Sequence, residues 1–313
     1  MNKMLKRDMF VLGICAVLFA LFQLGFTFKI IGSFWQLNII LVCINIILAV
    51  SLNLINGYTG QFSLGHAGFM AIGAYVGAIC TVKLALPLVV ALIAGALFAG
   101  FVGLLIGLPT LRLKGDYLAI ATLGFGEIIR LTVLNIPYIG GASGLTGIPR
   151  LTTFAWVFWL MILTVFIIKN LINSSAGRAC IAVRENEIAA EAMGVNTTKY
   201  KVMAFTVGAV FAGIAGVLFA HYFYLVHPSS FTFMKSIDIL TIVVLGGLGS
   251  MAGSIIGAIV LTFVSAVLAS YAEWRMIIYA VLLIVVMIFR PQGLLGDKDL
   301  TERILNRLKG GKR

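Results

Sequence analysis

The stretch GQFSLGHAGFMAIGAYVGA, residues 60–78, places a glutamine, a serine and a histidine among glycines, between long apolar runs. Glycine recurs at positions 57, 60, 65, 68, 73 and 77, which leaves one face of a helix almost without side chains. Small residues at such spacings let membrane helices approach closely. The stretch therefore predicts a tightly packed apolar helix that begins near residue 62, with a bend before it whose polar side chains pair with freed backbone groups.

Composition extends this prediction to the whole chain. Its 313 residues are 61% hydrophobic and 11% charged, whereas soluble domains average about 25% charged residues. The mean hydropathy of +1.09 points the same way. We expect an all-α polytopic membrane protein in which residues 1–313 form one transmembrane domain. The net charge of +12 does not indicate nucleic-acid binding, because the basic residues gather at the ends of apolar runs.

Ten apolar segments are candidates for membrane-crossing helices. They are residues 9–28, 36–55, 62–82, 86–109, 117–135, 153–169, 202–225, 237–250, 254–271 and 276–289. The first follows a basic start, and the lack of a small-residue cleavage site after it favours a retained helix over a signal peptide. The eighth is short and ends in glycines, and Asp238 at its start is expected to cap it.

The lysines and arginines choose the orientation of these helices. Ten spans place both termini on one side of the membrane. Cytoplasmic termini put the basic start, the polar segment 170–201 and the basic tail 290–313 inside, as the positive-inside rule requires. Arg130 lies within a span, and the basic residues left outside are Lys29, Lys83, Arg150, Lys235 and Arg275.

Two polar sets at or within the spans are candidates for a translocation path or gate. Gln61, Ser63 and His66 stand where the third span begins, and Ser63 is placed to cap that helix. The alternative to a gate here is the bend described above. Glu127 and Arg130, at i and i+3, share a helix face and can pair with each other, or they can face a water-filled path. The four cysteines have no ligand spacing and are expected to be packing residues, so no metal site is predicted.

The segment NSSAGRACIAVRENEIAAEAMGVNTTKYK, residues 173–201, is the longest polar stretch between spans. Its residues 184–193 are good helix formers, Gly194 stands where a helix-terminating glycine belongs, and Asn196 can start the next helix. These signals predict a short amphipathic helix on the cytoplasmic side, either a solvated connector or a surface that docks on a partner. The residues placed to make such contacts are Arg184, Glu185, Asn186, Glu187, Glu191 and Gly194.

The predicted external loop GGASGLTGIP, residues 140–149, contains a Gly-x-Ser-Gly sequence around Ser143 that is similar to the nucleophile motif of intramembrane serine proteases. A Ser–His dyad with His66 or His221 would need hydrogen-bond reach, which the predicted topology denies. Ser143 and Thr146 are retained as external-loop candidates, and no catalytic residue is expected. No phosphate-binding GxxxxGK[ST] loop is present, so energy from ATP would have to come through another chain.

Five stretches together resemble one family. They are GQFSLGHAGFMAIGAY, GDYLAIATLGFGEIIR, GGASGLTGIP, GRACIAVRENEIAAEAMGVNTTKYKVMAF and LGGLGSMAGSIIGA, in this order along the chain. In this combination the chain resembles the permease subunits of bacterial branched-chain amino acid ABC importers, on the LivM-type side of the heterodimer. The resemblance covers residues 53–258.

The resemblance implies an all-helical permease of the bacterial inner membrane. It implies a second related permease subunit, two ATPase subunits on the cytoplasmic face and a periplasmic or lipid-anchored substrate-binding protein as partners, with membrane lipid around them and no nucleic acid. ATP and Mg²⁺ would be bound by the ATPase subunits, and no cofactor by this chain. The segment 184–194 matches the family's coupling region.

The substrate class that follows from the resemblance is leucine, isoleucine and valine, carried by alternating access. Relatives that carry urea, short amides or another small solute provide the first alternative. The second is a secondary transporter that works alone, in which Glu127, Arg130 and His66 would form a proton relay.

Overall fold

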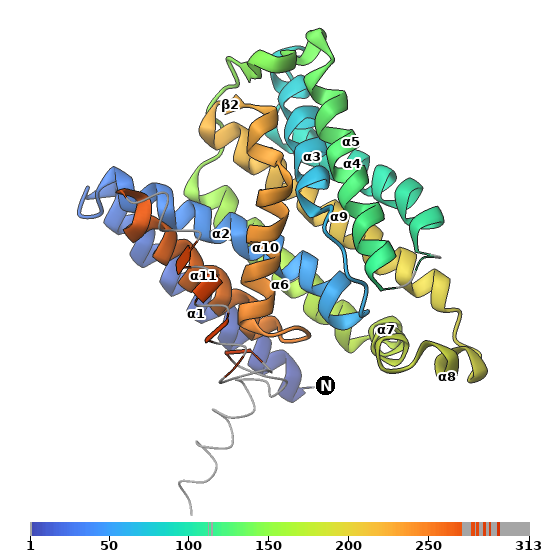
Figure 1. Cartoon of the computed structure of the whole chain (residues 1–313). Helices are drawn as coiled ribbons and strands as arrows, with labels where there is room; N and C mark the ends of the chain where they lie inside the picture. The colour runs from blue at the N-terminus through green and yellow to red at the C-terminus, as the bar shows by residue number, and fades with distance from the viewer. Residues whose placement is uncertain are drawn as a thin grey trace, which may run out of the picture.

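In the computed structural model the described residues are 2–111, 113, 115–270, 277, 278, 280, 281, 284, 285, 288, 293 and 294. The tenth predicted span, 276–289, and the basic tail, 290–313, lie largely outside them, as do Arg112 and Lys114. α-Helices make up most of the described structure (Figure 1). They are α1 (Asn2–Thr27), α2 (Ser33–Asn53), α3 (His66–Val82), α4 (Leu88–Thr110), α5 (Asp116–Leu134), α6 (Phe154–Asn173), α7 (Ser175–Glu185), α8 (Glu187–Ala192), α9 (Thr197–Phe223), α10 (Phe233–Gly246) and α11 (Met251–Val267).

Few of the described residues lie in β-strands. β1 (Leu145–Thr146) pairs antiparallel with β2 (Leu225–Val226), with Leu145 opposite Val226. This short ladder ties the loop between α5 and α6 to the end of α9. Short 3₁₀ turns lie at Pro137–Ile139, Gly141–Ser143, Pro228–Phe231 and Leu268–Ser270, and a π-helical turn lies at Leu54–Tyr58.

The centre of the fold is the packing of α3 against α4 and α9, which make the most extensive interhelical contacts. Glycines allow the backbones to touch. A Cβ atom on Gly73 would lie 2.1 Å from the carbonyl oxygen of Gly213, and one on Gly216 would lie 2.0 Å from that of Met70. The close glycine packing expected of α3 is confirmed, and it supplies the van der Waals contact that holds helices together in lipid.

Five helical segments in the described residues are long and apolar enough to cross a bilayer. They are Ser33–Tyr58, Leu88–Thr110, Asp116–Asn135, Phe154–Asn173 and Thr197–Phe223, and shorter apolar helices cover Cys15–Thr27, His66–Val82 and Met251–Val267. Each of the first nine predicted spans contains a helix. The all-helical membrane class is therefore confirmed, whereas the count of ten spans and the cytoplasmic termini stay predictions.

Two predicted helix starts are wrong. α3 begins at His66, not near residue 62, and its N-cap is Gly65, so Ser63 does not cap it. α10 begins at Phe233 after Thr232, which puts Asp238 in the second turn of the helix. In both cases a polar residue near the edge of an apolar run looked like a cap, but the chain's tertiary contacts set the boundary elsewhere.

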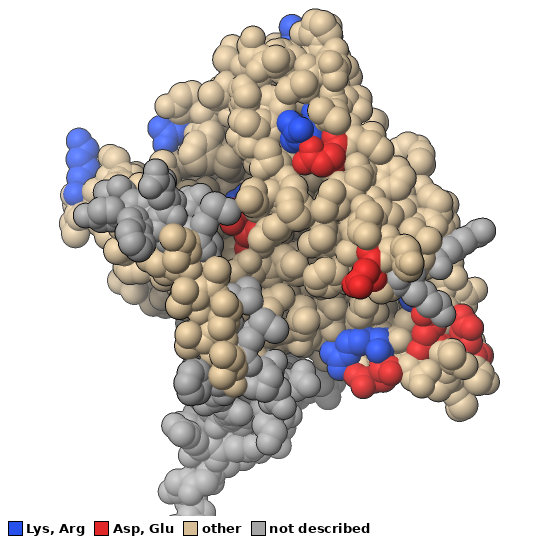
Figure 2. Space-filling model, viewed as in Figure 1, with Lys and Arg blue, Asp and Glu red and all other residues tan. Residues whose placement is uncertain are grey.

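Charged side chains are unevenly distributed. Figure 2 shows them gathered at the end of the molecule where α7 and α8 lie, with few across the rest of this face. That distribution fits a surface that is mostly covered by lipid and a polar end that faces water.

Candidate functional site

The helix that begins as α2 does not continue directly into α3. Its last turn is π-helical at Leu54–Tyr58, and residues 59–65 are then non-helical until His66. We call residues 54–65 the break segment. π-Helical turns are rare in proteins, and those that occur often lie at functional sites. Non-helical backbone at membrane depth is tolerated where protein buries it, and Gln61 and Ser63 are indeed buried.

Two asparagine side chains at the end of α2 and in the break segment pair with backbone groups outside regular helix. Asn56 donates from Nδ2 to the carbonyl oxygen of Ser63 at 3.4 Å and accepts from the Ser63 backbone N–H at 3.3 Å. Asn53 donates to the carbonyl oxygen of Ser250 at 3.0 Å and accepts from the Gly249 N–H at 2.9 Å, in the turn between α10 and α11. Polar side chains do pair with free backbone groups here, as expected of a bend, but the sequence did not single out these two asparagines. Two asparagines three positions apart at the end of an apolar run were the available signal.

The polar residues first singled out in this stretch are only partly paired. Gln61 donates from Nε2 to the carbonyl oxygen of Lys201 at 3.2 Å. The side-chain atoms Gln61 Oε1, Ser63 Oγ and His66 Nδ1 are buried and have no hydrogen-bond partner among the described residues.

His66 is anchored to α2. Its Nε2 lies 2.9 Å from Ser51 Oγ, and that hydroxyl donates to the carbonyl oxygen of Leu48 at 3.0 Å. Because the hydroxyl has one hydrogen, we assign the donor role to His66 Nε2. His221 lies by the far end of α3, about 25 Å along a helix of this length. Both of its ring nitrogens are engaged, by Thr81 Oγ1 at 2.9 Å and the Val217 carbonyl oxygen at 2.8 Å. Neither histidine is hydrogen-bonded to Ser143.

The end of the break segment packs on α5, and the first turn of α3 packs on α10. The Leu64 N–H donates to Thr122 Oγ1 at 3.0 Å, and the Ala67 N–H donates to Ser236 Oγ at 3.1 Å. A Cβ atom on Gly65 would lie 2.4 Å from the carbonyl oxygen of Thr122. The break segment and the first turn of α3 therefore connect to two further helices.

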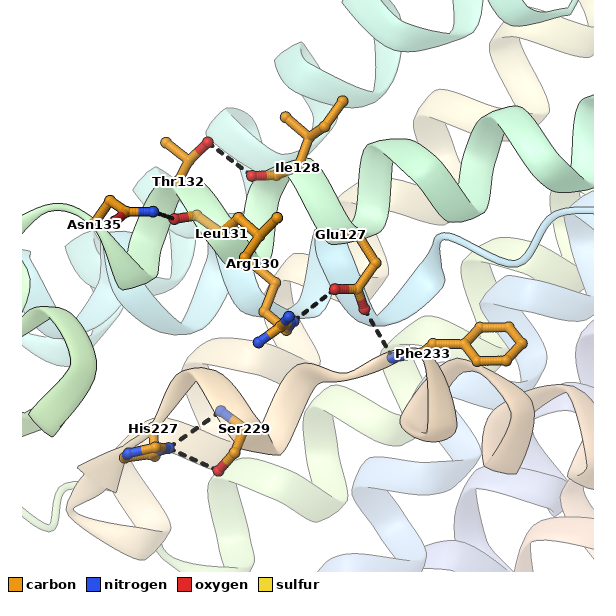
Figure 3. Close-up of polar contacts among 9 residues, drawn as sticks. All are labelled: Glu127, Ile128, Arg130, Leu131, Thr132, Asn135, His227, Ser229 and Phe233. Atoms are coloured by element: carbon orange, nitrogen blue, oxygen red, sulfur yellow. Dashed lines mark hydrogen bonds and ion pairs between the residues drawn. The ribbon is translucent and has the colours of Figure 1, made fainter.

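The predicted pair of Glu127 and Arg130 is confirmed and extended (Figure 3). Glu127 Oε2 accepts from Arg130 Nε at 2.7 Å, while Oε1 accepts from the Phe233 N–H at 3.3 Å. Phe233 is the first residue of α10, so the Glu127 carboxylate lies at the positive end of that helix. The pair thus fastens α5 to α10. The contact with Phe233 joins residues far apart in the chain, so the i, i+3 spacing of Glu127 and Arg130 could not predict it.

The predicted single helix over residues 184–193 is wrong. Asn186, with φ −160° and ψ 109°, separates α7 from α8, and its Oδ1 accepts from the Ala189 N–H at 3.0 Å as the N-cap of α8. Gly194 follows α8 in the left-handed region at φ +83°, as expected of a terminating glycine. Asn196 caps α9 by accepting from the Lys199 N–H at 2.9 Å.

Most of the charged candidates of α7 and α8 bind other parts of the chain. Glu187 pairs with Lys201 at 2.5 Å, and Glu191 Oε1 accepts from Thr197 Oγ1 at 2.7 Å. Arg184 bridges two groups, because it pairs with Glu185 at 2.6 Å and donates from Nη1 to the carbonyl oxygen of Gly57. A cavity of about 240 Å³ lies among these groups, lined by residues 59–62, 183–187 and Lys201, with Leu111, Leu113, Gly115 and Leu118 on its other side.

Apolar side chains are exposed on the same polar end. Ile188 is 75% exposed and Met193 is 84% exposed, although neither lies in a membrane span. Sequence reasoning weighed the charges of this segment and missed these two. Large apolar side chains exposed to water are typical of surfaces that bind another protein.

The external-loop candidates lie at the end of the molecule where β1 pairs with β2, opposite the end that carries α7 and α8 (Figure 1). Ser143 ends the 3₁₀ turn at Gly141–Ser143 and Thr146 lies in β1 opposite Leu225. Both side chains are exposed.

The family described as branched-chain amino acid transport system / permease component matches residues 35–288. The chain belongs to this family. The permease is 40% identical to the high-affinity branched-chain amino acid transport system permease protein LivM of Escherichia coli (strain K12), over 82% of this chain and 68% of that protein. It is 27% identical to the probable LivM of Methanocaldococcus jannaschii, over 68% of this chain and 69% of that protein. No solved structure matches the permease.

A second kind of relative carries the LivH name. The permease is 31% identical to the LivH permease protein of Salmonella typhimurium, over 57% of this chain and 59% of that protein. Relatives of both names point to a transport system with two related permeases. The break segment, α5, α7, α8 and α10 of the permease all lie within the matched residues.

Proposed function

We propose that this permease is the membrane-spanning subunit of an ATP-driven importer for leucine, isoleucine and valine in a bacterial cytoplasmic membrane. Family membership and the names of the relatives support the solute class. The partners would be a second, LivH-like permease, two ATPase subunits that bind ATP and Mg²⁺, and a periplasmic or lipid-anchored binding protein. In this arrangement the chain needs no cofactor and no catalytic residue, and it has ten spans with both termini in the cytoplasm.

The ATPase subunits would bind the surface of α7 and α8. Ile188 and Met193 supply exposed apolar anchors there, and interface contacts are dominated by a few such side chains. The charged residues of the segment have another role in this proposal. Glu187 and Glu191 hold α8 to the start of α9 through Lys201 and Thr197, so that a partner which moves α8 also moves α9.

The contact that carries the proposal is the hydrogen bond from Arg184 to the carbonyl oxygen of Gly57. It joins the cytoplasmic helix α7 to the break segment. The break segment in turn contacts α5 through Leu64 and Thr122, and the first turn of α3, which follows it directly, contacts α10 through Ala67 and Ser236. Closure of the ATPase pair would therefore reach the membrane helices as a rigid displacement of packed elements.

A carrier that works alone would need Glu127, Arg130 and His66 to form a proton relay. Two observations disfavour this alternative. Glu127 has both oxygens engaged, one by Arg130 and one by the N-terminus of α10. His66 is bound to Ser51 of α2 instead, and no hydrogen bond links it to the pair.

The test is uptake by the reconstituted complex, assembled with the second permease, both ATPase subunits and the binding protein. We expect leucine uptake that requires ATP and is inhibited by isoleucine and valine but not by urea. Vesicles that contain this chain alone should not transport. Leucine uptake by the chain alone, driven by a proton gradient, would replace the importer with a secondary transporter. Inhibition by urea instead of valine would retain the importer and change its substrate.

A further inference from the structure

A second polar cavity lies apart from the break segment, between α2, α10 and α11. It has a volume of about 290 Å³, and the three helices that enclose it pack against one another (Figure 1). Each helix contributes two polar side chains. They are Asn38 and Asn45 from α2, Lys235 and Asp238 from α10, and Thr262 and Ser265 from α11.

The spacing of these residues explains why they meet. Members of each pair are three or seven positions apart, which puts them on one face of their helix. Lys235 and Asp238 carry charge inside an otherwise uncharged helix. Ionisable residues within membrane helices are costly and mark the paths of substrates and ions. The cavity combines one positive and one negative side chain with neutral polar groups.

The asparagine side chains leave acceptors for a ligand. Asn38 donates from Nδ2 to the carbonyl oxygen of Phe34 at 2.8 Å, and Asn45 donates from Nδ2 to Thr262 Oγ1 at 2.9 Å. Neither Oδ1 atom accepts a hydrogen bond from a described residue, although Asn38 is only 8% exposed. Both residues line the cavity, so a ligand that donates hydrogen bonds there would find two amide oxygens with room to accept them.

We propose that this cavity binds a zwitterionic α-amino acid with a small aliphatic side chain. Its carboxylate would pair with Lys235. Its ammonium group would bind Asp238 and the two amide oxygens, because ammonium has three donors and no acceptor. Leu37, Leu41, Ile242 and Leu261 provide apolar wall for the side chain. Lys235 and Asp238 already take part in interactions within the chain, which the ligand would share or exchange.

The position suits a solute that arrives from outside the cell. Phe34 and Lys235, which line the cavity, are among the first residues of α2 and α10. In the proposed topology both helices begin at the external face, so the cavity lies in the outer half of the membrane. This inference rests on the proposed import function and names a substrate site for it.

The experiment measures binding of leucine to the assembled complex in nanodiscs, without the binding protein, by saturation-transfer NMR. Leucinamide, which lacks the carboxylate, and 4-methylpentanoate, which lacks the ammonium group, serve as competitors and should not displace leucine. Asp238→Asn and Lys235→Gln should each weaken leucine binding about tenfold or more, because each removes a charge-assisted contact. Lys83→Gln, a charge change at the C-terminus of α3, is the matched control and should bind normally.

A second measurement tests the site even if the charge variants fail to assemble. Ser265→Cys in the otherwise native complex should react with a small methanethiosulfonate reagent, and leucine should protect it while 4-methylpentanoate should not. Leucine binding at wild-type strength in both charge variants, or labelling of Cys at 265 without protection, overturns the site. Equal displacement of leucine by ethanolamine phospholipid would assign the cavity to a lipid headgroup and also overturn it. ATP-dependent leucine uptake measured in parallel separates these outcomes from failure of the import function.

Discussion

Arg184 Nη1 donates a hydrogen bond to the carbonyl oxygen of Gly57 at 3.0 Å, although the two residues are 127 positions apart in the chain. This bond connects a helix on the polar end of the molecule to the break between two apolar helices. Gly60 leaves room for the Arg184 side chain, since a Cβ atom there would lie 3.1 Å from Arg184 Cγ. In the proposed mechanism Arg184 is one route by which a displacement of α7 reaches the membrane helices, beside the packing of α7 on α6 and α9.

Replacement of Arg184 should uncouple transport from ATP hydrolysis. In Arg184→Ala we expect the ATPase subunits to co-purify, ATP to be hydrolysed, and leucine uptake per ATP to fall about tenfold, because a charge-assisted hydrogen bond of about 1.5–3 kcal/mol is lost. Arg178→Ala is the matched control. Arg178 lies on the same helix, and its Nη1 donates to the carbonyl oxygen of Asn173 near its own helix. Equal uptake per ATP in the two variants would show that Arg184 is not part of the route.

The exposed apolar side chains of α8 should decide ATPase binding. The double variant Ile188→Asp with Met193→Asp should lose co-purification of the ATPase subunits while the permease remains folded, because substitutions of exposed residues change stability by about 0.5 kcal/mol or less. Glu187→Lys with Glu191→Lys should have a different effect. It should detach α8 from Lys201 and Thr197 and reduce uptake more than ATPase binding. Unchanged co-purification in the aspartate variant, checked against Lys199→Ala, would contradict docking at α8.

The effect of replacing a glycine on stability should depend strongly on its position. A Cβ atom on Gly73 would lie 2.1 Å from the Gly213 carbonyl oxygen, whereas one on Gly124 would have no neighbour within 4 Å. Gly73→Ala should therefore force α3 and α9 apart and cost about 1–3 kcal/mol of stability. Gly124→Ala should be neutral or slightly stabilising. Thermal unfolding of the purified permease in detergent compares the two, and equal melting temperatures would contradict the close approach.

His66 should behave as a structural anchor. Ser51→Ala removes the hydroxyl that His66 Nε2 contacts and leaves a buried ring without a partner, which costs about 1–3 kcal/mol. His66→Asn should likewise lower the melting temperature. In both variants the fraction of complex that assembles should transport leucine at near wild-type rates per molecule. Loss of transport with normal stability would favour a gate at this position.

Cys180 should resist alkylation as long as α7 stays packed on α9. Burial raises the pKa of the Cys180 thiol to about 11, and the side chain is 1% exposed. At neutral pH the reactive thiolate is therefore much scarcer than in an ordinary cysteine, and raising the pH toward 11 should increase labelling. Peptide mass spectrometry after N-ethylmaleimide treatment at pH 7 measures this. Rapid labelling of the folded protein would show that α7 leaves α9.

The sequence by itself determined the features whose physical causes are local. Composition together with long apolar runs predicts membrane helices, because a helix pairs all of its backbone polar groups within its own segment. Gly194 and Asn196 mark helix ends through the conformation and the side chain of a single residue. The Glu127–Arg130 pair follows from one turn of helix.

Tertiary structure alone decided which helix faces meet. In lipid a core-facing surface and a lipid-facing surface are both apolar, so hydrophobic periodicity carries little information about neighbours. The starts of α3 and α10, the hydrogen bonds from Asn53 to the turn after α10, and the bond from Arg184 to Gly57 all depend on segments far apart in the chain. Asp238 illustrates the point, because a residue that looked like a helix cap lies instead on the wall of a polar cavity that three helices build together.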